Sequence, residues 1–179
     1  DGVHEKVGKV EISETDLGLK FDVYIKGINV GEHGFHVHEK PNIEPALKEG
    51  KMTAGFAAGM HFDPFRTDKH LGPYRNGHLG DLPFLTANRE EIIDESVIAP
   101  RLSTISEIKG RSLIIHSHGD NYSDFPLPNG GGKSRIIGGI ITEKCPYCVK
   151  KNPRKNKMAA GYQSYAWTTQ DWRSIFLHN

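Results

Sequence analysis

The chain lacks several features that would place it in other protein classes. Its 179 residues include only two cysteines, Cys145 and Cys148, which excludes a scaffold held together by many disulfides. No run of about 18 apolar residues occurs, so the sequence predicts no membrane-spanning helix. The net charge is +1 and the pI about 8.0, whereas nucleic-acid-binding domains are usually far more basic. The chain is long enough to bury the core of one domain.

The sequence begins at Asp1 instead of Met and shows no signal peptide, so we expect a mature or trimmed product. Before residue 150 the apolar residues do not recur at the spacing of an amphipathic helix, so no helix is predicted there. Residues 19–26 alternate apolar and mostly polar side chains, and with Val10 and Ile12 they predict a hairpin near 3–26. Further short strands are expected near 31–38, 96–99, 111–116 and 134–141. Short strands joined by turns predict an all-β sandwich or barrel.

Two histidines, His36 and His38, lie two residues apart in the segment 34–40. On an extended strand they point to the same side, so both imidazoles can bind one ion. Imidazole suits copper, zinc, iron or nickel, and the pair alone does not identify the metal. An isolated pair of this kind also occurs as ordinary surface or core residues. Whether His36 and His38 bind metal therefore depends on the other histidines of the chain.

Residues 41–90 contain several prolines and no sustained period, and so long an irregular segment is usually functional or disordered. They also contain three histidines and one aspartate, a nitrogen and oxygen ligand set that suits four-coordinate zinc: His61, His70, His78 and Asp81. A bound ion would hold a loop that has no strand or helix of its own. His116, at the end of a predicted strand, is a further candidate ligand.

Five segments, in this order, resemble bacterial copper,zinc superoxide dismutases. They are 34–39 (GFHVHE), 57–64 (AAGMHFDP), 70–83 (HLGPYRNGHLGDLP), 116–124 (HSHGDNYSD) and 130–141 (GGGKSRIIGGII). The resemblance covers about residues 3–141. It implies a Greek-key antiparallel β-sandwich or flattened barrel with a long metal-binding loop. It also implies the family's electrostatically steered, diffusion-limited reaction, for which superoxide dismutases are a well-known example.

The resemblance assigns roles to individual residues. The copper ligands would be His36, His38, His61 and His116. The zinc ligands would be His61, His70, His78 and Asp81, so that His61 bridges the two metals. Arg135 would receive the anionic substrate, and Asp120 would link a ligand of one metal to a ligand of the other. His33 would hold loops together without binding metal.

The implied activity is that of an oxidoreductase, with copper and zinc as cofactors and superoxide as substrate. Copper redox cycling would convert superoxide to dioxygen and hydrogen peroxide, while zinc supports the bridging His61. The family expectation for location is the periplasm or secretion. A non-enzymatic copper or zinc buffer or carrier on the same fold is the alternative function. A homodimer assisted by the C-terminal tail is a further expectation, with no nucleic-acid partner.

The chain departs from the family pattern at two positions where the family usually has a disulfide. Ile43 and Gly138 occupy the matching positions, so that bridge cannot form. A bridge closing so long a loop typically contributes about 2–4 kcal/mol. We therefore expect residues 41–90 to depend more on zinc or on packing.

Two further departures concern candidate ligands. Cys145 and Cys148 stand in the segment CPYC, which resembles a glutaredoxin motif, but too little chain follows for a thioredoxin-like domain. A local disulfide, or half of a metal site, is the expectation instead. His118 follows His116 by two residues and could be an extra ligand, a proton donor or an exposed bystander.

We expect residues 1–144 to form the β-sandwich domain and 145–179 a C-terminal extension. Residues 150–157 are basic and read as a solvated linker. Residues 168–171 can form a capping box, which predicts a short helix with Trp172, Ile175 and Phe176 on one face. Such an aromatic tail should pack on the sandwich or on a second subunit, and disorder is the alternative.

Overall fold

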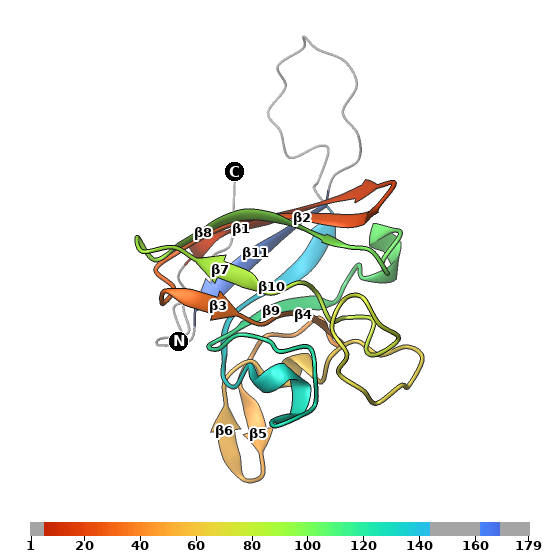
Figure 1. The fold of residues 1–179 in the computed structure, drawn as a ribbon. Coiled ribbons are helices and arrows are strands. Elements are labelled where there is room, and N and C mark those ends of the chain that lie inside the picture. The colour runs from red at the N-terminus through yellow and green to blue at the C-terminus, as the bar shows by residue number, and fades with distance from the viewer. Residues whose placement is uncertain (1–5, 144–161, 169–179) are drawn as a thin grey trace.

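A computed structural model of the chain describes residues 6–143 and 162–168 (Figure 1). Seven strands form one sheet in the order β4-β9-β10-β11-β1-β2-β8, with every pairing antiparallel. These strands are β1 (Lys6–Thr15), β2 (Gly18–Lys26), β4 (Phe35–His38), β8 (Ile92–Ala99), β9 (Ser112–His116), β10 (Arg135–Glu143) and β11 (Tyr162–Thr168). The predicted all-β fold is confirmed, and the helices of the described residues are three short 3₁₀ turns, η1 (Phe56–Ala58), η2 (Ile105–Glu107) and η3 (Pro128–Gly131).

The predicted hairpin is β1 and β2, which pair in register from Gly8↔Ile25 to Thr15↔Gly18. Alternate residues such as Ile12 and Phe21 are buried, while their neighbours along each strand are more exposed. This period of two is what a sheet with one solvated face requires. Gly18 closes the turn with φ 122°, a conformation that a residue with a Cβ rarely adopts.

The long sheet curls, so that strands from its two ends face each other across one core (Figure 1). Phe21 of β2 meets Phe35 of β4 edge to face, with ring centroids 5.6 Å apart. Val37 of β4, Leu113 and Ile115 of β9 fill the same core. On β4, Phe35 and Val37 therefore point inward, which turns His36 and His38 to the opposite face of the sheet. The metal-binding candidates and the core share one strand.

The C-terminal extension contributes a strand to this sheet and no described helix. β11 pairs with β10 from Ile137↔Thr168 to Glu143↔Tyr162, and with β1 on its other edge. The prediction of a short helical extension is thus not supported. The segment YQSYAWT is rich in residues that favour strands, and β10 and β1 both offer edges for it to pair with. Residues 169–179, which include the predicted aromatic helix face, and Cys145 and Cys148 lie outside the described residues.

Three loops gather at the outer face of β4, β9 and β10 (Figure 1): the 39–60 loop, the 61–84 loop and the 117–134 loop. The 39–60 loop contains a small hairpin of β5 (Ala46–Lys48) and β6 (Lys51–Thr53), together with η1. The expectation of an irregular stretch over 41–90 was therefore too broad. The expected strand at 31–38 is split at Gly34 into β3 (Gly31–His33) and β4, and β3 pairs with β7 (Leu85–Ala87).

None of the helices in the described ranges has the length and apolar character that a membrane span would need.

Candidate metal centre

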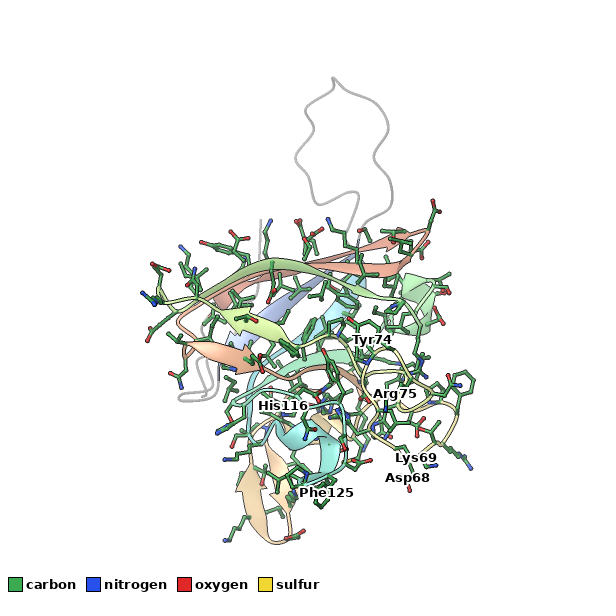
Figure 2. The ribbon with its side chains drawn as sticks, viewed as in Figure 1. Asp68, Lys69, Tyr74, Arg75, His116 and Phe125 are labelled. Atoms are coloured by element: carbon green, nitrogen blue, oxygen red, sulfur yellow. The ribbon has the colours of Figure 1, made fainter. Side chains whose placement is uncertain are left out.

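Four buried histidines converge at the outer face of the β4–β9 pair. His36 and His38 lie on β4, and His116 ends the neighbouring strand β9. His61 begins the 61–84 loop and forms an isolated antiparallel bridge with His38. Each of the four can present one ring nitrogen such that all four atoms lie within 4.8 Å of one another. These are the four residues that the sequence resemblance assigned to copper, and Figure 2 shows His116 within the region that the loops enclose.

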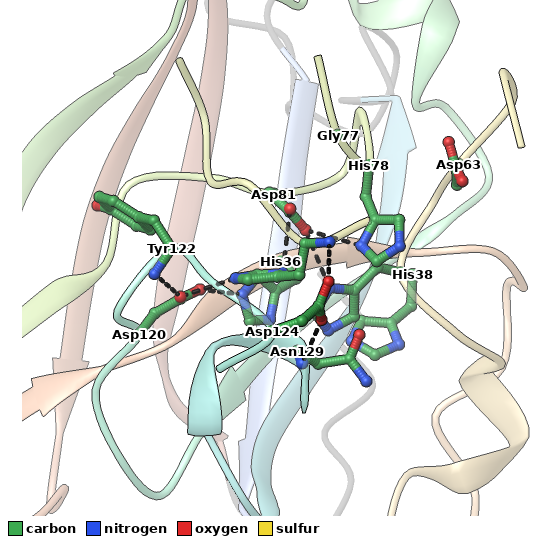
Figure 3. A network of polar contacts seen from close by, with 12 residues as sticks. His36, His38, Asp63, Gly77, His78, Asp81, Asp120, Tyr122, Asp124 and Asn129 are labelled. Atoms are coloured by element: carbon green, nitrogen blue, oxygen red, sulfur yellow. Dashed lines mark hydrogen bonds and ion pairs between the residues drawn. The ribbon is translucent and has the colours of Figure 1, made fainter. Parts of the chain in front are cut away.

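A second group lies beside the first and is centred on the carboxylate of Asp81. The Nδ1 atoms of three histidines lie close to it: His61 at 2.9 Å, His70 at 3.0 Å and His78 at 3.4 Å. Four ligands of a tetrahedral zinc ion, with bonds of about 2.0–2.1 Å, lie roughly 3.3 Å apart. The spacing therefore suits zinc, and Figure 3 shows His78 and Asp81 facing each other. Asp81 also forms an isolated bridge with His36, which brings the two groups into contact.

The buried side-chain polar atoms without a hydrogen-bond partner provide a test of the fit. Among the described residues these atoms all belong to the two groups: Nδ1 of His36, His70 and His78, Nε2 of His38 and His116, and Oδ2 of Asp81. A buried polar atom that lacks a partner costs about 1–3 kcal/mol. Six such atoms directed into one region are explained if metal ions bind there. The residues present thus fit both copper and zinc.

Most of these histidines use their other ring nitrogen to contact the protein. His38 Nδ1 donates to the carbonyl of Gly59 over 2.9 Å, and His116 Nδ1 donates to that of Lys133 over 3.2 Å. Burial, and then the charges of neighbouring histidines, hold the pKa values of His38 and His116 well below 6.5. Both rings are therefore neutral, with Nε2 free to bind, which is the state that metal ligation requires.

His61 lies between the two groups. Its ring stacks on that of His36, with centroids 3.9 Å apart, and its Nδ1 faces Asp81. Burial first, and then the charge of His36, lower the pKa of His61 to about 3. Nδ1 of His61 therefore lies with the candidate zinc ligands around Asp81. The same ring also belongs to the candidate copper group of His36, His38 and His116, which is the position that a bridging ligand requires.

Asp120 connects the two groups from outside. His36 Nε2 donates to its Oδ2 over 2.6 Å (Figure 3), and His70 Nε2 donates to its Oδ1 over 2.7 Å. Burial would raise the pKa of Asp120, but these hydrogen bonds outweigh it and hold the pKa below its usual range. Burial would lower the pKa of His70, but its hydrogen bond to Asp120 and the nearby charge of the Asp81 carboxylate raise it to about 9.

Arg135 lies opposite His116 in the β9–β10 register. Its Nη1 donates to Gly55 O and its Nη2 to Gly59 O, both over 2.7 Å. Burial lowers the pKa of Arg135 to about 10, so the side chain remains cationic at neutral pH. Two hydrogen bonds to the backbone fix the guanidinium on the side of the group that contains His38 and His116.

Two further histidines have roles that the structure separates clearly. His33 is buried, with its ring nitrogens 2.7 Å from His116 O and 2.7 Å from Asn29 O, so it joins two segments of backbone. His118 is exposed and belongs to neither ligand group. Lys133 Nζ donates to its Nε2 over 3.2 Å. Of the three roles considered for His118, the exposed position favours that of a bystander.

The place of the absent disulfide is filled by apolar contact. Ile43 is buried with Ala58 and Ile114, and a methyl group added to Gly138 would lie 3.4 Å from Cβ of Ile43. The 39–60 loop is therefore packed directly onto β10 at this point.

Sequence reasoning overlooked side chains that hold the 61–84 loop from outside. Arg101 binds the carbonyls of Gly77 and His78. Asp124 Oδ2 accepts from the backbone N–H of His70 over 2.8 Å. Asp124 lies in one of the segments that carry the resemblance, so a signal existed. Arg101 stands in no motif, and no sequence signal could have identified it.

The chain has extensive similarity to proteins already known. The family model described as copper/zinc superoxide dismutase (SODC) matches residues 6–141. A superoxide dismutase [Cu-Zn] 2 from Salmonella typhimurium is 50% identical over 140 residues, which cover 78% of this chain and 81% of that protein.

Solved structures of the same family are also similar to this chain. The Cu/Zn superoxide dismutase from Brucella abortus has 50% identity and a TM-score of 0.75, covering 76% of this chain and 88% of that one. A copper, zinc superoxide dismutase from Salmonella enterica, described as monomeric, has 49% identity and a TM-score of 0.69, covering 78% and 90%.

Proposed function

The chain belongs to the copper/zinc superoxide dismutase family, and from that premise we propose which of its residues carry the reaction. The activity is the disproportionation of superoxide, with copper and zinc as cofactors. One superoxide loses an electron and becomes dioxygen, while a second gains an electron and two protons and becomes hydrogen peroxide. Bound copper supplies the electron exchange by alternating between two oxidation states.

The proposed copper ligands are His36, His38, His61 and His116, and the proposed zinc ligands are His61, His70, His78 and Asp81. The observation that carries this assignment is the set of buried, unpartnered ligand atoms that point into one region. The strands β4 and β9 hold three of the copper ligands rigidly. The zinc ligands come from a loop, so zinc would order that loop as well as fix His61.

Arg135 is proposed to bind the superoxide anion. The two hydrogen bonds to Gly55 and Gly59 orient its fork of donors, and a guanidinium offers further N–H groups to a small anion. The fixed orientation means that little reorganisation is needed when the anion arrives. The positive charge also attracts the substrate from solution.

His61 is proposed to handle the proton. Its Nδ1 faces Asp81, which leaves Nε2 to take a proton from water and pass it to the reduced anion. Burial and the charge of His36 lower the pKa of His61 to about 3, so the ring is uncharged at neutral pH and able to serve as a ligand. Asp120 and His33 are proposed to hold the ligands and their strands in place, as their contacts suggest.

The experiment that tests this assignment measures metal content and superoxide removal on the same samples. Wild-type protein loaded with copper and zinc should remove superoxide, and His116→Ala should lose copper and fall to the background rate while retaining zinc. An exposed histidine provides the control, since His118→Ala should keep both metals and the activity. Equal activity in wild type and His116→Ala at verified copper loading would refute the proposed copper site.

A periplasmic or secreted location and a tail-assisted homodimer remain proposals, as does the division into residues 1–144 and 145–179. The pairing of β11 with β10 and β1 supports a stabilising role for the extension within one subunit. A chain ending at residue 143 should keep its metal chemistry but unfold at lower temperature. Sedimentation of the two forms would test the dimer, because an unchanged association state after truncation would exclude assistance by the tail. The metal-buffer alternative gains no support from His118, which faces solvent.

A further inference from the structure

Arg101 is a half-buried arginine in the segment that follows β8, outside all three loops around the metal centre. Its Nη1 donates to His78 O over 3.0 Å and its Nη2 donates to Gly77 O over 2.9 Å. The planar guanidinium presents these donors at a fixed spacing, so two successive carbonyls are held in one orientation. A single side chain thus grips the peptide unit that carries the His78 imidazole.

The base of Arg101 is rigid. Its neighbour Leu102 is completely buried, donates to Ala99 O over 3.2 Å and accepts from Leu19 N over 2.8 Å. These bonds tie the segment to the ends of β8 and β2. The Arg101 side chain therefore extends from a rigid part of the sandwich. Its hydrogen bonds fix the 61–84 loop relative to the core.

The peptide between Gly77 and His78 lies next to an exposed part of the loop, so a support such as Arg101 matters there. Tyr74, Arg75 and Asn76, just before it, are exposed and form the outer part of the loop (Figure 2). Gly77 lies so close to Lys69 O that an added methyl group would be 2.4 Å from it, and His78 N donates to the same carbonyl over 2.9 Å. The backbone at residues 77–78 therefore lies directly against that of Lys69.

His78 and His70 are held differently. The ring of His70 bonds to Asp120 and its backbone N–H bonds to Asp124. The contacts that hold His78 include its main chain, through Lys69 O and Arg101, while its Nδ1 faces Asp81. Rotation of this peptide would move the ligand nitrogen away from the other three.

We propose that Arg101 is a positioning residue for the zinc ligand His78, so that zinc affinity depends on a side chain that does not touch the metal. The inference rests on the proposed assignment of His78 to zinc. Arg101 holds the peptide 77–78 in the orientation that directs Nδ1 of His78 toward Asp81. The copper ligands on β4 and β9 do not use this support.

The test measures zinc and copper affinities of the metal-depleted full-length chain by competition with chelators, with the absorption spectrum of cobalt(II) as a probe of ligand geometry. Arg101→Gln should weaken zinc binding by about 10- to 100-fold, as loss of a partner around a metal ligand typically does, and should alter the cobalt spectrum. Arg101→Lys keeps the charge but not the fork, and should give a smaller loss. Arg89→Gln and Arg89→Lys remove the same groups from an exposed turn and should bind zinc as the wild type does.

Wild-type zinc affinity in Arg101→Gln would overturn the proposal, and so would an equal loss of zinc and copper affinity, which would mean general loosening. If Arg101→Gln does not fold, Arg101→Lys decides by the same comparison. His78→Ala separates the two assignments. If it loses zinc while Arg101→Gln does not, only the role of Arg101 fails. If it binds zinc normally, the ligand assignment fails as well.

Discussion

The 39–60 loop and the 61–84 loop lie side by side at the metal centre but are held by different forces. The arms of the 39–60 loop pair with each other, through Glu39 N to Met60 O, Lys40 N to Ala58 O and Ala57 N to Glu44 O. Its buried Ile43 and Ala58 pack on Ile114 beside Gly138, and Arg135 binds two of its carbonyls. None of these contacts uses a side chain of a proposed metal ligand.

The 61–84 loop, by contrast, directs its buried polar atoms inward. Nδ1 of His70 and of His78 and Oδ2 of Asp81 have no hydrogen-bond partner in the protein. Arg101 and Asp124 support its backbone from outside. We therefore expect metal binding to order the 61–84 loop and to have little effect on the 39–60 loop. The expectation of metal dependence across residues 41–90 is thereby narrowed to the 61–84 loop.

Removing zinc should give the largest contrast between the two loops. Amide hydrogen exchange in the 61–84 loop should accelerate by about a hundredfold or more, because the unpartnered ligand atoms then favour local opening. Exchange in the 39–60 loop should change little. Exchange followed by mass spectrometry, before and after chelation, measures both in one sample. Equal acceleration in the two loops would refute the distinction.

Ile43→Ala should loosen the 39–60 loop alone. Ile43 is 6% exposed, and truncating a buried isoleucine should lower the free energy of unfolding by about 2 kcal/mol, roughly thirtyfold in the folding equilibrium. Zinc affinity should not change. Leu47→Ala is the control, since Leu47 lies in the same loop but is 64% exposed. Denaturant unfolding and zinc titration would check the pair, and a loss of zinc affinity in Ile43→Ala would show that the two loops are coupled.

Arg135→Ile should slow superoxide removal by roughly tenfold with both metals still bound, and should weaken the dependence of the rate on salt. The cause is loss of the attracting charge together with the fork bound to Gly55 and Gly59. Arg135→Lys keeps the charge and should retain the salt dependence while losing part of the rate. Rates measured at several ionic strengths separate the two effects. An unchanged rate in Arg135→Ile would exclude the proposed anion site.

Zinc affinity should rise with pH by about tenfold per unit until pH reaches about 9, the pKa of His70 in the metal-free protein. Below that pH, zinc must displace a proton from His70. Without metal, the raised pKa stabilises the fold fully below the unfolded value of 6.5, and this contribution is lost as pH rises through about 9. Calorimetry in buffers of different ionisation enthalpy counts the released proton. Asp120→Asn should lower the pKa of His70 and bring the plateau to lower pH, and a plateau that stays in place would contradict this explanation.

Some of the structure follows from sequence alone because it depends on local pattern. Alternation in 19–26 predicts β2, since a half-buried strand exposes every second residue. The spacing of His36 and His38 predicts ligands on one face, because Phe35 and Val37 must face the core. The remaining candidate ligands are histidines and an aspartate, residue types whose side chains can bind metal. Their motifs therefore predict nearly all residues of the candidate site.

Other features depend on partners that are distant in the chain. The segment YQSYAWT can form a strand, but only the open edges of β10 and β1 decide that it does. His118 has the spacing of a ligand, yet β9 ends at His116, and His118 then lies in solvent. Arg101 has no motif and becomes important only through the carbonyls it reaches.

The sequence by itself indicated the strands β1, β2, β4, β9 and β10, the ligand types and the absence of a bridge between positions 43 and 138. Only the tertiary structure decided that the 39–60 loop packs onto β10, that the candidate ligand atoms of the 61–84 loop face one region, and which side chains contact each loop from outside. The physical reason is the distance along the chain between the residues that interact. Side-chain alternation and ligand chemistry are written in neighbouring residues, whereas the hydrogen bonds of Arg101, Asp120 and Arg135 join segments that meet only after the sheet has curled.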